Sequence, residues 1–266
     1  MKVSAPIARG IAALQQLVQL DEGGRGIGAL VRPGQLLAAA QPLTQAGGVL
    51  ILTGFPCLRE RSPPVETDGP PGAASLARTL LALGAEPVTL LIEDHSEAAL
   101  RRCVVVAAGG GTAANVVGFP TADRWLPADD ERLESLRTSA GALVCIERAG
   151  ESADGVCYTM RGLPMGPTLL GHMNRLLMPS AGLRSVGIGD GGNELGMGSL
   201  YAEVCRAVPN GEKIGCVVAA DDALVASVSN WGGYALSCAV ALLSWDAGAS
   251  HGQTSEPGPR ADSPPA

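Results

Sequence analysis

Aromatic residues are scarce in this sequence. Trp, Tyr and Phe together make up 3% of its 266 residues, whereas hydrophobic residues as a class make up 46%. The core must therefore consist mainly of Leu, Val, Ile and Ala, which typically fill a parallel sheet covered by helices. No apolar stretch reaches the roughly 18–20 residues that a membrane-spanning helix needs, so the sequence predicts no membrane partner.

Clustered basic residues are also missing. The net charge is −7 and the isoelectric point is about 5.0. Nucleic acids and anionic membranes bind concentrated basic surfaces, so the composition excludes both as partners. A small, partly anionic substrate remains compatible, because one or two local arginines can hold it.

The usual metal and nucleophile patterns are absent as well. Three isolated histidines, at positions 95, 172 and 251, show no HxH or HExxH spacing, which argues against a zinc site or a Ser–His triad. Seven cysteines form no CxxC pair. This scattered set predicts reduced thiols packed in the core and a reducing compartment.

Short apolar runs alternate with segments of helical period along the chain. Strand-like runs occupy residues 49–53, 87–92, 104–108, 143–146, 185–188 and 215–219. Helices are expected near residues 73–83, 97–103, 168–178 and 232–244, and a loop followed by a helix is expected over 121–139. This alternation predicts a single α/β domain with a doubly wound, mostly parallel sheet and helices on both faces. Polar residues follow several strands directly, where such folds bind ligands.

The two ends of the chain differ from the middle. Residues 1–20 lack acidic residues and have helical spacing, so they are either an ordinary amphipathic helix or a weak mitochondrial presequence. Residues 21–246 form the predicted domain. Gly, Ser, Pro and Gln dominate residues 247–266, which predicts a disordered tail.

A first candidate loop, residues 66–72, carries Glu66, Thr67 and Asp68 directly before a predicted helix. Carboxylates beside a helix N-terminus lie where backbone N–H groups and the helix dipole favour anions. Asp68 either caps this helix or takes part in chemistry. Capping does not account for Glu66 or for the paired prolines that follow.

A second candidate loop is the glycine-rich segment 187–198, with Asp190, Asn193 and Glu194. Its glycines let backbone amides approach a ligand closely, and its oxygens suit a hard cation such as Mg²⁺ or an ammonium group. The alternative is a tight turn without function. The segment is neither the GxGxxG fingerprint nor a P-loop, so no nucleotide is expected.

Two further sets of polar residues complete the candidates. Ser229, Asn230 and Trp231 open the last predicted helix, as cap and core residues or as ligand contacts. The other set is Glu147 and Arg148, which end a predicted strand, together with Asp154 and Arg161, and Arg148 at the strand end can clamp a carboxylate in bidentate fashion. An arginine–glutamate surface pair is the alternative.

Five motifs in a fixed order carry a family resemblance. They are LILTGFP at 50–56, ETDGPPGA at 66–73, IERAG at 146–150 with ADG at 153–155, GIGDGGNELGMG at 187–198 and VSNWGGYAL at 228–236. Together they resemble the C-terminal domain of the D-glutamate cyclase-like family, across about residues 21–246. Two stretches, 99–140 and 158–167, differ from the family's expected pattern.

The resemblance implies a lyase that closes D-glutamate to 5-oxo-D-proline with loss of water, in the mitochondrial matrix; without it, the location expected is cytoplasmic. It also implies a separate, hydro-lyase-like domain as a partner. One alternative is a non-catalytic binding or regulatory domain that serves this partner. Another is a nucleotide-dependent enzyme, which only the glycine-rich loops suggest.

Within this resemblance, the catalytic residues expected are Asp68, Asp190 and Glu194. Asp68 and Asp190 serve as base and ammonium holder, and Glu194 or a divalent cation on Asp190 and Glu194 assists departure of the oxygen. Arg148 and Asn230 hold the α-carboxylate. The remaining substrate contacts expected are Thr53, Gly54, Glu66, Thr67, Glu147, Gly191, Asn193, Ser229 and Trp231.

Overall fold

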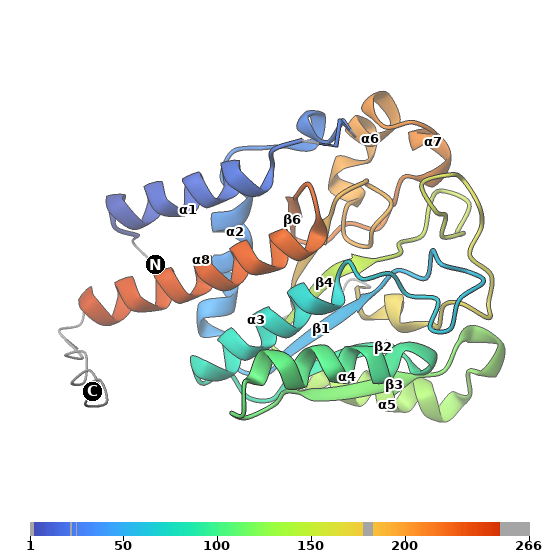
Figure 1. Ribbon diagram of the computed structural model, residues 1–266, viewed down its shortest axis with the longest axis horizontal. Coiled ribbons are helices and arrows are strands. Elements are labelled where there is room, and N and C mark those ends of the chain that lie inside the picture. Colours follow the sequence, from blue (N-terminus) through green and yellow to red (C-terminus); the bar gives the residue numbers. More distant parts are fainter. Residues whose placement is uncertain (1–2, 22, 25, 178–182, 251–266) are drawn as a thin grey trace, which may run out of the picture.

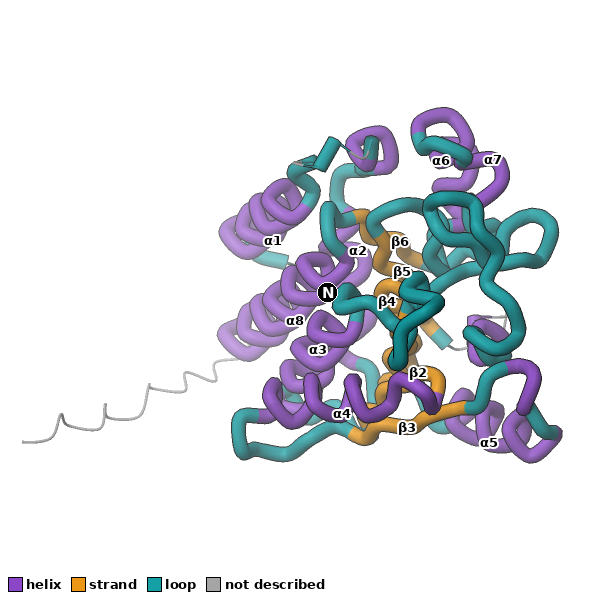
Figure 2. The backbone as a smooth tube through the Cα atoms, turned by 45° about the vertical axis from the view of Figure 1, so that its right-hand side comes forward, coloured by secondary structure: helices purple, strands orange, loops and turns teal. Residues whose placement is uncertain are grey.

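The structure is a computed structural model that describes residues 3–21, 23–24, 26–177 and 183–250. Within these residues, six parallel strands form one sheet in the order β3-β2-β1-β4-β5-β6 (Figures 1 and 2). The strands are β1 (Val49–Gly54), β2 (Val88–Glu93), β3 (Asn115–Phe119), β4 (Ala142–Arg148), β5 (Arg184–Gly189) and β6 (Asp222–Val225). The strand order reverses between β1 and β4, and open parallel sheets bind ligands at such a switch point. The predicted α/β class is confirmed.

Helices cover both faces of the sheet, to different extents (Figures 1 and 2). One face carries α2, α3, α4 and α8, with α1 packed outside them, and the other carries α5 and a 3₁₀ turn. The helices are α1 (Ala5–Val18), α2 (Gln35–Ala40), α3 (Pro70–Ala82), α4 (Asp94–Ala108), α5 (Pro127–Thr138), α6 (Tyr201–Ala207), α7 (Gly211–Ile214) and α8 (Ser229–Ser250). The 3₁₀ turns are Ile27–Leu30, Gln41–Gln45, Ala122–Arg124, Met173–Leu177 and Gly198–Leu200.

Alternation along the central strands divides the hydrophobic core into two layers. Ile51 and Val144 face the layer below α3 and α8, whereas Leu52 and Cys145 face the layer below α5. All four side chains are buried. Because helices cover both faces of the sheet, its strands are continuous apolar runs. Such runs can be recognised in the sequence, which is why most of the strands were predicted correctly.

Several predicted elements differ from the observed ones. Residues 104–108 end α4, and the strand follows at 115–119, because a short apolar run cannot by itself distinguish a strand from a buried helix. The apolar run at 215–219 precedes β6, which occupies 222–225. Of the helix expected at 168–178, residue 178 lies outside the described residues, and among the others only 173–177 form a helical turn, which is 3₁₀.

The structure agrees with the prediction at the N-terminal end of the chain but not at the predicted C-terminal boundary. α1 occupies most of the segment expected to be helical at residues 1–20, and the presequence alternative stays a prediction. α8 continues to Ser250, so the boundary predicted at residue 247 falls within this helix. The rest of the predicted tail, 251–266, lies outside the described residues.

Among the described residues, no helix combines the length and the apolar character that crossing a membrane requires.

Two glycines let α3 and α8 approach closely. A Cβ atom on Gly233 of α8 would lie 2.8 Å from the Cα atom of Gly72 in α3, which is closer than real Cβ contacts come. A Cβ atom on Gly72 would lie 3.0 Å from the Cα atom of Asn230. Backbone packed against backbone cannot yield as a flexible side chain can, so this contact fixes the spacing of the two helices.

We expect the Gly233→Ala variant to lower the free energy of unfolding by about 1–3 kcal/mol, because the added methyl group forces the helices apart. Urea denaturation measures this change. The control is Gly248→Ala on the same helix, where a Cβ atom would meet open space. That variant should leave stability unchanged or raise it by up to about 1 kcal/mol. Equal effects of the two substitutions would contradict the close approach.

Candidate functional site

A cavity of about 460 Å³ opens at the carboxyl ends of β1, β4 and β5, beside the switch point of the sheet. Its walls are the loop between β1 and α3, the loop that follows β4, and the glycine-rich loop after β5. The predicted residues that line it are Glu66, Asp68, Glu147, Asp190 and Asn193. The structure therefore brings together acidic residues from three separate motifs.

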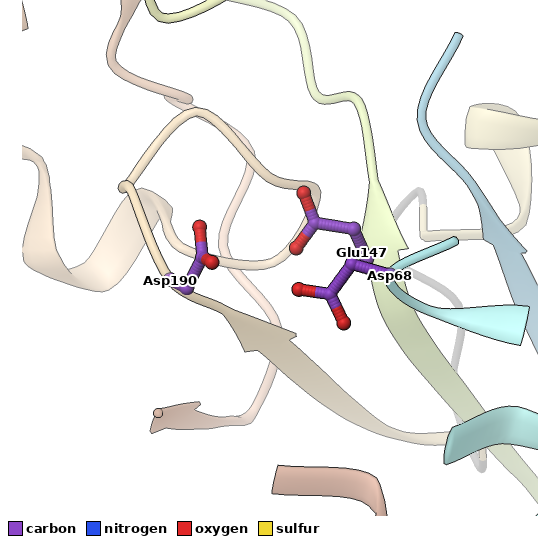
Figure 3. A group of neighbouring side chains, drawn as sticks. All are labelled: Asp68, Glu147 and Asp190. Carbon is purple, nitrogen blue, oxygen red and sulfur yellow. The ribbon is translucent and has the colours of Figure 1, made fainter. Parts of the chain in front are cut away.

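Three carboxylates face one another across this cavity (Figure 3). Asp68 comes from the loop before α3, Glu147 from the end of β4, and Asp190 from the residue after β5. One oxygen atom from each lies within 4.8 Å of the others. Carboxylates at such distances repel one another unless a proton, an ammonium group or a metal ion lies between them. The arrangement is therefore suited to a cationic ligand.

Glu147 occupies an irregular position in the sheet. Thr53 of β1 pairs with Ile146 and Gly54 pairs with Arg148, so Glu147 is the extra residue of a β-bulge. Its φ angle is +45°, a left-handed conformation that non-glycine residues seldom adopt. Strained backbone of this kind concentrates at functional sites, where it directs a side chain.

The Glu147 side chain is held in a buried environment. Its exposed fraction is 5%, and its Oε2 atom accepts a hydrogen bond of 2.5 Å from the Ser229 hydroxyl. Burial raises the pKa of the Glu147 carboxyl well above its ordinary value, and the surrounding carboxylates, Asp190 foremost, raise it further. Glu147 therefore holds a proton more tightly than an ordinary glutamate, a property of groups that donate protons in catalysis.

Asp68 and Asn230 cap each other's helices. The Asp68 carboxylate accepts hydrogen bonds from the backbone N–H groups of Ser229 and Asn230, at 2.9 and 2.7 Å, at the start of α8. The Asn230 Oδ1 atom accepts hydrogen bonds from the N–H groups of Gly69 and Gly72, at 3.0 and 2.8 Å, at the start of α3. Asp68 is thus a cap, as one sequence interpretation proposed, but of α8 instead of the helix that follows it. It also lines the cavity.

Glu194 has a different environment from the three facing carboxylates. Its oxygens accept hydrogen bonds from the N–H groups of Asp190, Gly191 and Gly192, at 2.9, 2.7 and 2.7 Å. The side chain is buried and is not part of the cavity lining. Glu194 therefore stabilises the glycine-rich loop that carries Asp190. A cation bound by Asp190 would have Asp68 and Glu147 as its other ligands, instead of the predicted Glu194.

Arg148 lies apart from the cavity lining. Its Nη1 atom donates to the Glu93 carboxylate at 2.7 Å, and its Nε atom donates to the Asn174 side chain at 2.8 Å. Both members of the Arg148–Glu93 ion pair are buried. These contacts join the ends of β4 and β2. Arg148 therefore has a structural role and is not placed to hold a substrate carboxylate in the cavity, as the sequence predicted.

The remaining predicted residues surround the cavity or lie outside it. Thr53 is fully buried, and its hydroxyl has no hydrogen-bond partner among the described residues. The Thr67 carbonyl accepts a hydrogen bond from the Asn230 side chain, and the Asn193 side chain donates to the Tyr158 carbonyl. Trp231 is 42% exposed and lines a separate apolar groove between α1 and α8.

Residues outside the predicted site complete the lining, and among them Arg161 belonged to a candidate set in the sequence. They are Phe55, Cys57, Leu58, Thr159, Met160, Arg161, Leu163 and Val228. The sequence grouped Arg161 with Glu147, Arg148 and Asp154 but gave the carboxylate contact to Arg148, whereas no pattern marked the apolar lining residues. Burial, with help from Glu66, raises the pKa of the Cys57 thiol to about 11. This thiol therefore stays protonated at neutral pH and is a poor nucleophile.

We expect the Arg148→Met variant to lower the free energy of unfolding by about 3–5 kcal/mol, because the Glu93 carboxylate would remain buried without its partner. Chemical denaturation measures this loss. The matched control is Arg175→Met, which breaks the exposed Arg175–Asp130 pair, and it should cost at most about 1 kcal/mol. A loss no larger than that of the control would argue against the structural role of Arg148.

Comparison with known proteins identifies the family. The family described as D-glutamate cyclase-like, C-terminal, matches residues 14–257. The mitochondrial D-glutamate cyclase of Homo sapiens is 37% identical over 258 residues, which cover 90% of this chain and 40% of that relative. The chain thus spans well under half the length of the human protein. It belongs to the D-glutamate cyclase-like family and corresponds to its C-terminal domain.

Proposed function

We propose that this chain is a carbon–oxygen lyase that interconverts D-glutamate and 5-oxo-D-proline plus water. The observation that carries the proposal is the group of three facing carboxylates in a cavity of about 460 Å³. Such a group favours a ligand with an ammonium group. The 37% identity with human D-glutamate cyclase supports glutamate as that ligand.

The reaction makes two demands on the protein. The α-ammonium group must lose a proton before its nitrogen can attack the γ-carboxyl carbon and form the C–N bond. The nitrogen must also lose a second proton, and an oxygen of that carboxyl group must gain two protons and leave as water, with cleavage of a C–O bond. A base near the nitrogen and an acid near the departing oxygen meet these demands.

The environments of the three carboxylates suggest how these roles are divided. Asp190 is the base, and Asp68, which the start of α8 fixes in place, holds the ammonium group. Glu147 is the acid, because it is buried and its pKa is raised. Glu194, to which the sequence gave a part in oxygen departure, acts indirectly by holding the loop that carries Asp190.

A non-catalytic binding or regulatory domain is the second candidate. The match to only 40% of the human relative favours it, because the rest of that protein can hold catalytic groups of its own. In this proposal the chain works with a separate hydro-lyase-like domain.

The mitochondrial designation of the human relative supports a mitochondrial matrix location over a cytoplasmic one.

NMR of the purified chain with D-glutamate tests the catalytic proposal. We expect 5-oxo-D-proline to accumulate, and we expect the Asp190→Asn variant to lose about 10²–10⁴-fold in rate, the usual contribution of a general base. The matched control is Asp130→Asn on the exposed face of α5, where Asp130 pairs with Arg175; its rate should stay within about twofold. Full activity of Asp190→Asn would remove Asp190 from the mechanism. Binding of D-glutamate without conversion by a folded chain would favour the regulatory candidate.

A divalent cation on the same carboxylates stays a prediction. Carboxylate oxygens are the ligands that Mg²⁺ and Mn²⁺ prefer, and the three facing side chains would supply them. We expect MgCl₂ or MnCl₂ to raise the Tm of the chain more than NaCl of equal ionic strength, and we expect the Asp190→Asn variant to lose this difference. Equal Tm values in the chloride salts would show the cation prediction to be wrong. ATP and NAD should leave the Tm unchanged.

A further inference from the structure

We propose that Arg161 binds the α-carboxylate of the substrate at the mouth of the cavity, so that an amino-dicarboxylic substrate enters with its amino group first. This inference deepens the proposed function and rests on it for the choice of D-glutamate as the probe. Arg148, which the sequence favoured for this contact, is committed to Glu93 and Asn174.

The charges of the cavity require a positive group. Four acidic residues line it, Glu66, Asp68, Glu147 and Asp190, and Arg161 is the only lysine or arginine among the described lining residues. Glutamate carries two carboxylates and one ammonium group. An all-acidic site would attract the ammonium group but repel the two carboxylates. Arg161 supplies the opposite charge that a carboxylate needs.

The Arg161 guanidinium group is available for a ligand. Among the described residues, no hydrogen bond or ion pair involves Arg161, and its side chain is exposed. Arg148 differs on both points, since it is buried and bonded to two neighbours. A guanidinium group that has no protein partner and lines an acidic cavity can form a bidentate pair with a carboxylate.

The backbone holds Arg161 in a defined place. Gly162 donates its N–H to the Thr159 carbonyl at 2.8 Å, which closes a turn with Arg161 at its third position. The Lys213 ammonium group donates to the Gly162 carbonyl at 2.8 Å. Asn193, from the glycine-rich loop, anchors the carbonyl of Tyr158 at 2.7 Å. The backbone of the turn is therefore tied to the loop that carries Asp190, and a ligand has to order only the Arg161 side chain.

A neighbouring cavity extends the positive charge. It has a volume of about 580 Å³, shares Cys57, Leu58 and Leu163 with the acidic cavity, and carries Arg59 and Arg61 together with Glu60. The lining of this second cavity thus holds two arginines and one acidic residue, whereas that of the first holds four acidic residues and one arginine. This separation of charge orients a ligand that has an ammonium group and a carboxylate.

The chemistry of ring closure selects the carboxylate that Arg161 binds. The amino group and the γ-carboxyl group must meet, so both lie among the acidic residues. The α-carboxylate takes no part in bond making and keeps its charge in the substrate, the transition state and the product. Arg161 therefore stabilises all three alike, and its loss should raise KM without lowering kcat.

Steady-state kinetics with D-glutamate provide the first test. We expect Arg161→Gln to raise KM at least tenfold with kcat within threefold of wild type, and Arg161→Lys to recover part of the loss. Arg102→Gln on the exposed side of α4, outside both cavity linings, is the control and should match wild type. An Arg161→Gln variant with the KM of the control would overturn the inference while leaving the proposed function intact.

Calorimetric binding provides a second test that does not depend on turnover. The probes are D-glutamate and 4-aminobutanoate, which is the same molecule without its α-carboxylate. We expect Arg161→Gln to weaken D-glutamate binding at least tenfold and to leave 4-aminobutanoate binding unchanged. This pattern in a chain without turnover would support the inference and refute the proposed function. Equal weakening of both ligands, or wild-type binding of D-glutamate no tighter than of 4-aminobutanoate, would overturn the inference.

Discussion

The site depends on the reciprocal capping of α3 and α8. Asp68 satisfies backbone N–H groups at the start of α8, and Asn230 satisfies those at the start of α3. Each cap comes from a segment about 160 positions away in the chain. The backbone N–H groups at both helix starts therefore find these hydrogen-bond acceptors only once the chain has folded. The close approach of Gly72 and Gly233 makes these bonds geometrically possible. The same contact places Ser229 within hydrogen-bond distance of Glu147.

This arrangement explains how several carboxylates coexist at one edge of the sheet. The starts of two helices supply N–H groups and positive dipole ends near Asp68, and the glycine-rich loop supplies N–H groups to Glu194. Among the described residues, only the Ser229 hydroxyl donates a hydrogen bond to the Glu147 carboxyl group, whose raised pKa reflects burial beside other acids. The residual negative charge favours a cationic group, which agrees with an amino substrate.

The order of strands and loops was largely predictable, because it depends on local pattern. Apolar runs marked β1, β2, β4 and β5, and the acidic loops that follow β1 and β5 were recognised. The sequence could not show in the same way which of Glu147 and Arg148 lines the cavity. They are neighbours in sequence, but the bulge at Glu147 turns it toward the cavity, while Arg148 forms a buried ion pair with Glu93 at the end of β2. No sequence pattern marks such a bulge when the residue is not glycine.

The sequence by itself determined the fold class, the family and the acidic character of the site, because these follow from periodicity, composition and five ordered motifs. Only the tertiary structure decided which acids meet. It joined Asp68, Glu147 and Asp190, assigned Glu194 to its own loop, and replaced Arg148 by Arg161 as the arginine of the cavity. The physical reason is that side-chain direction depends on bulges, caps and close helix contacts between segments distant in the chain.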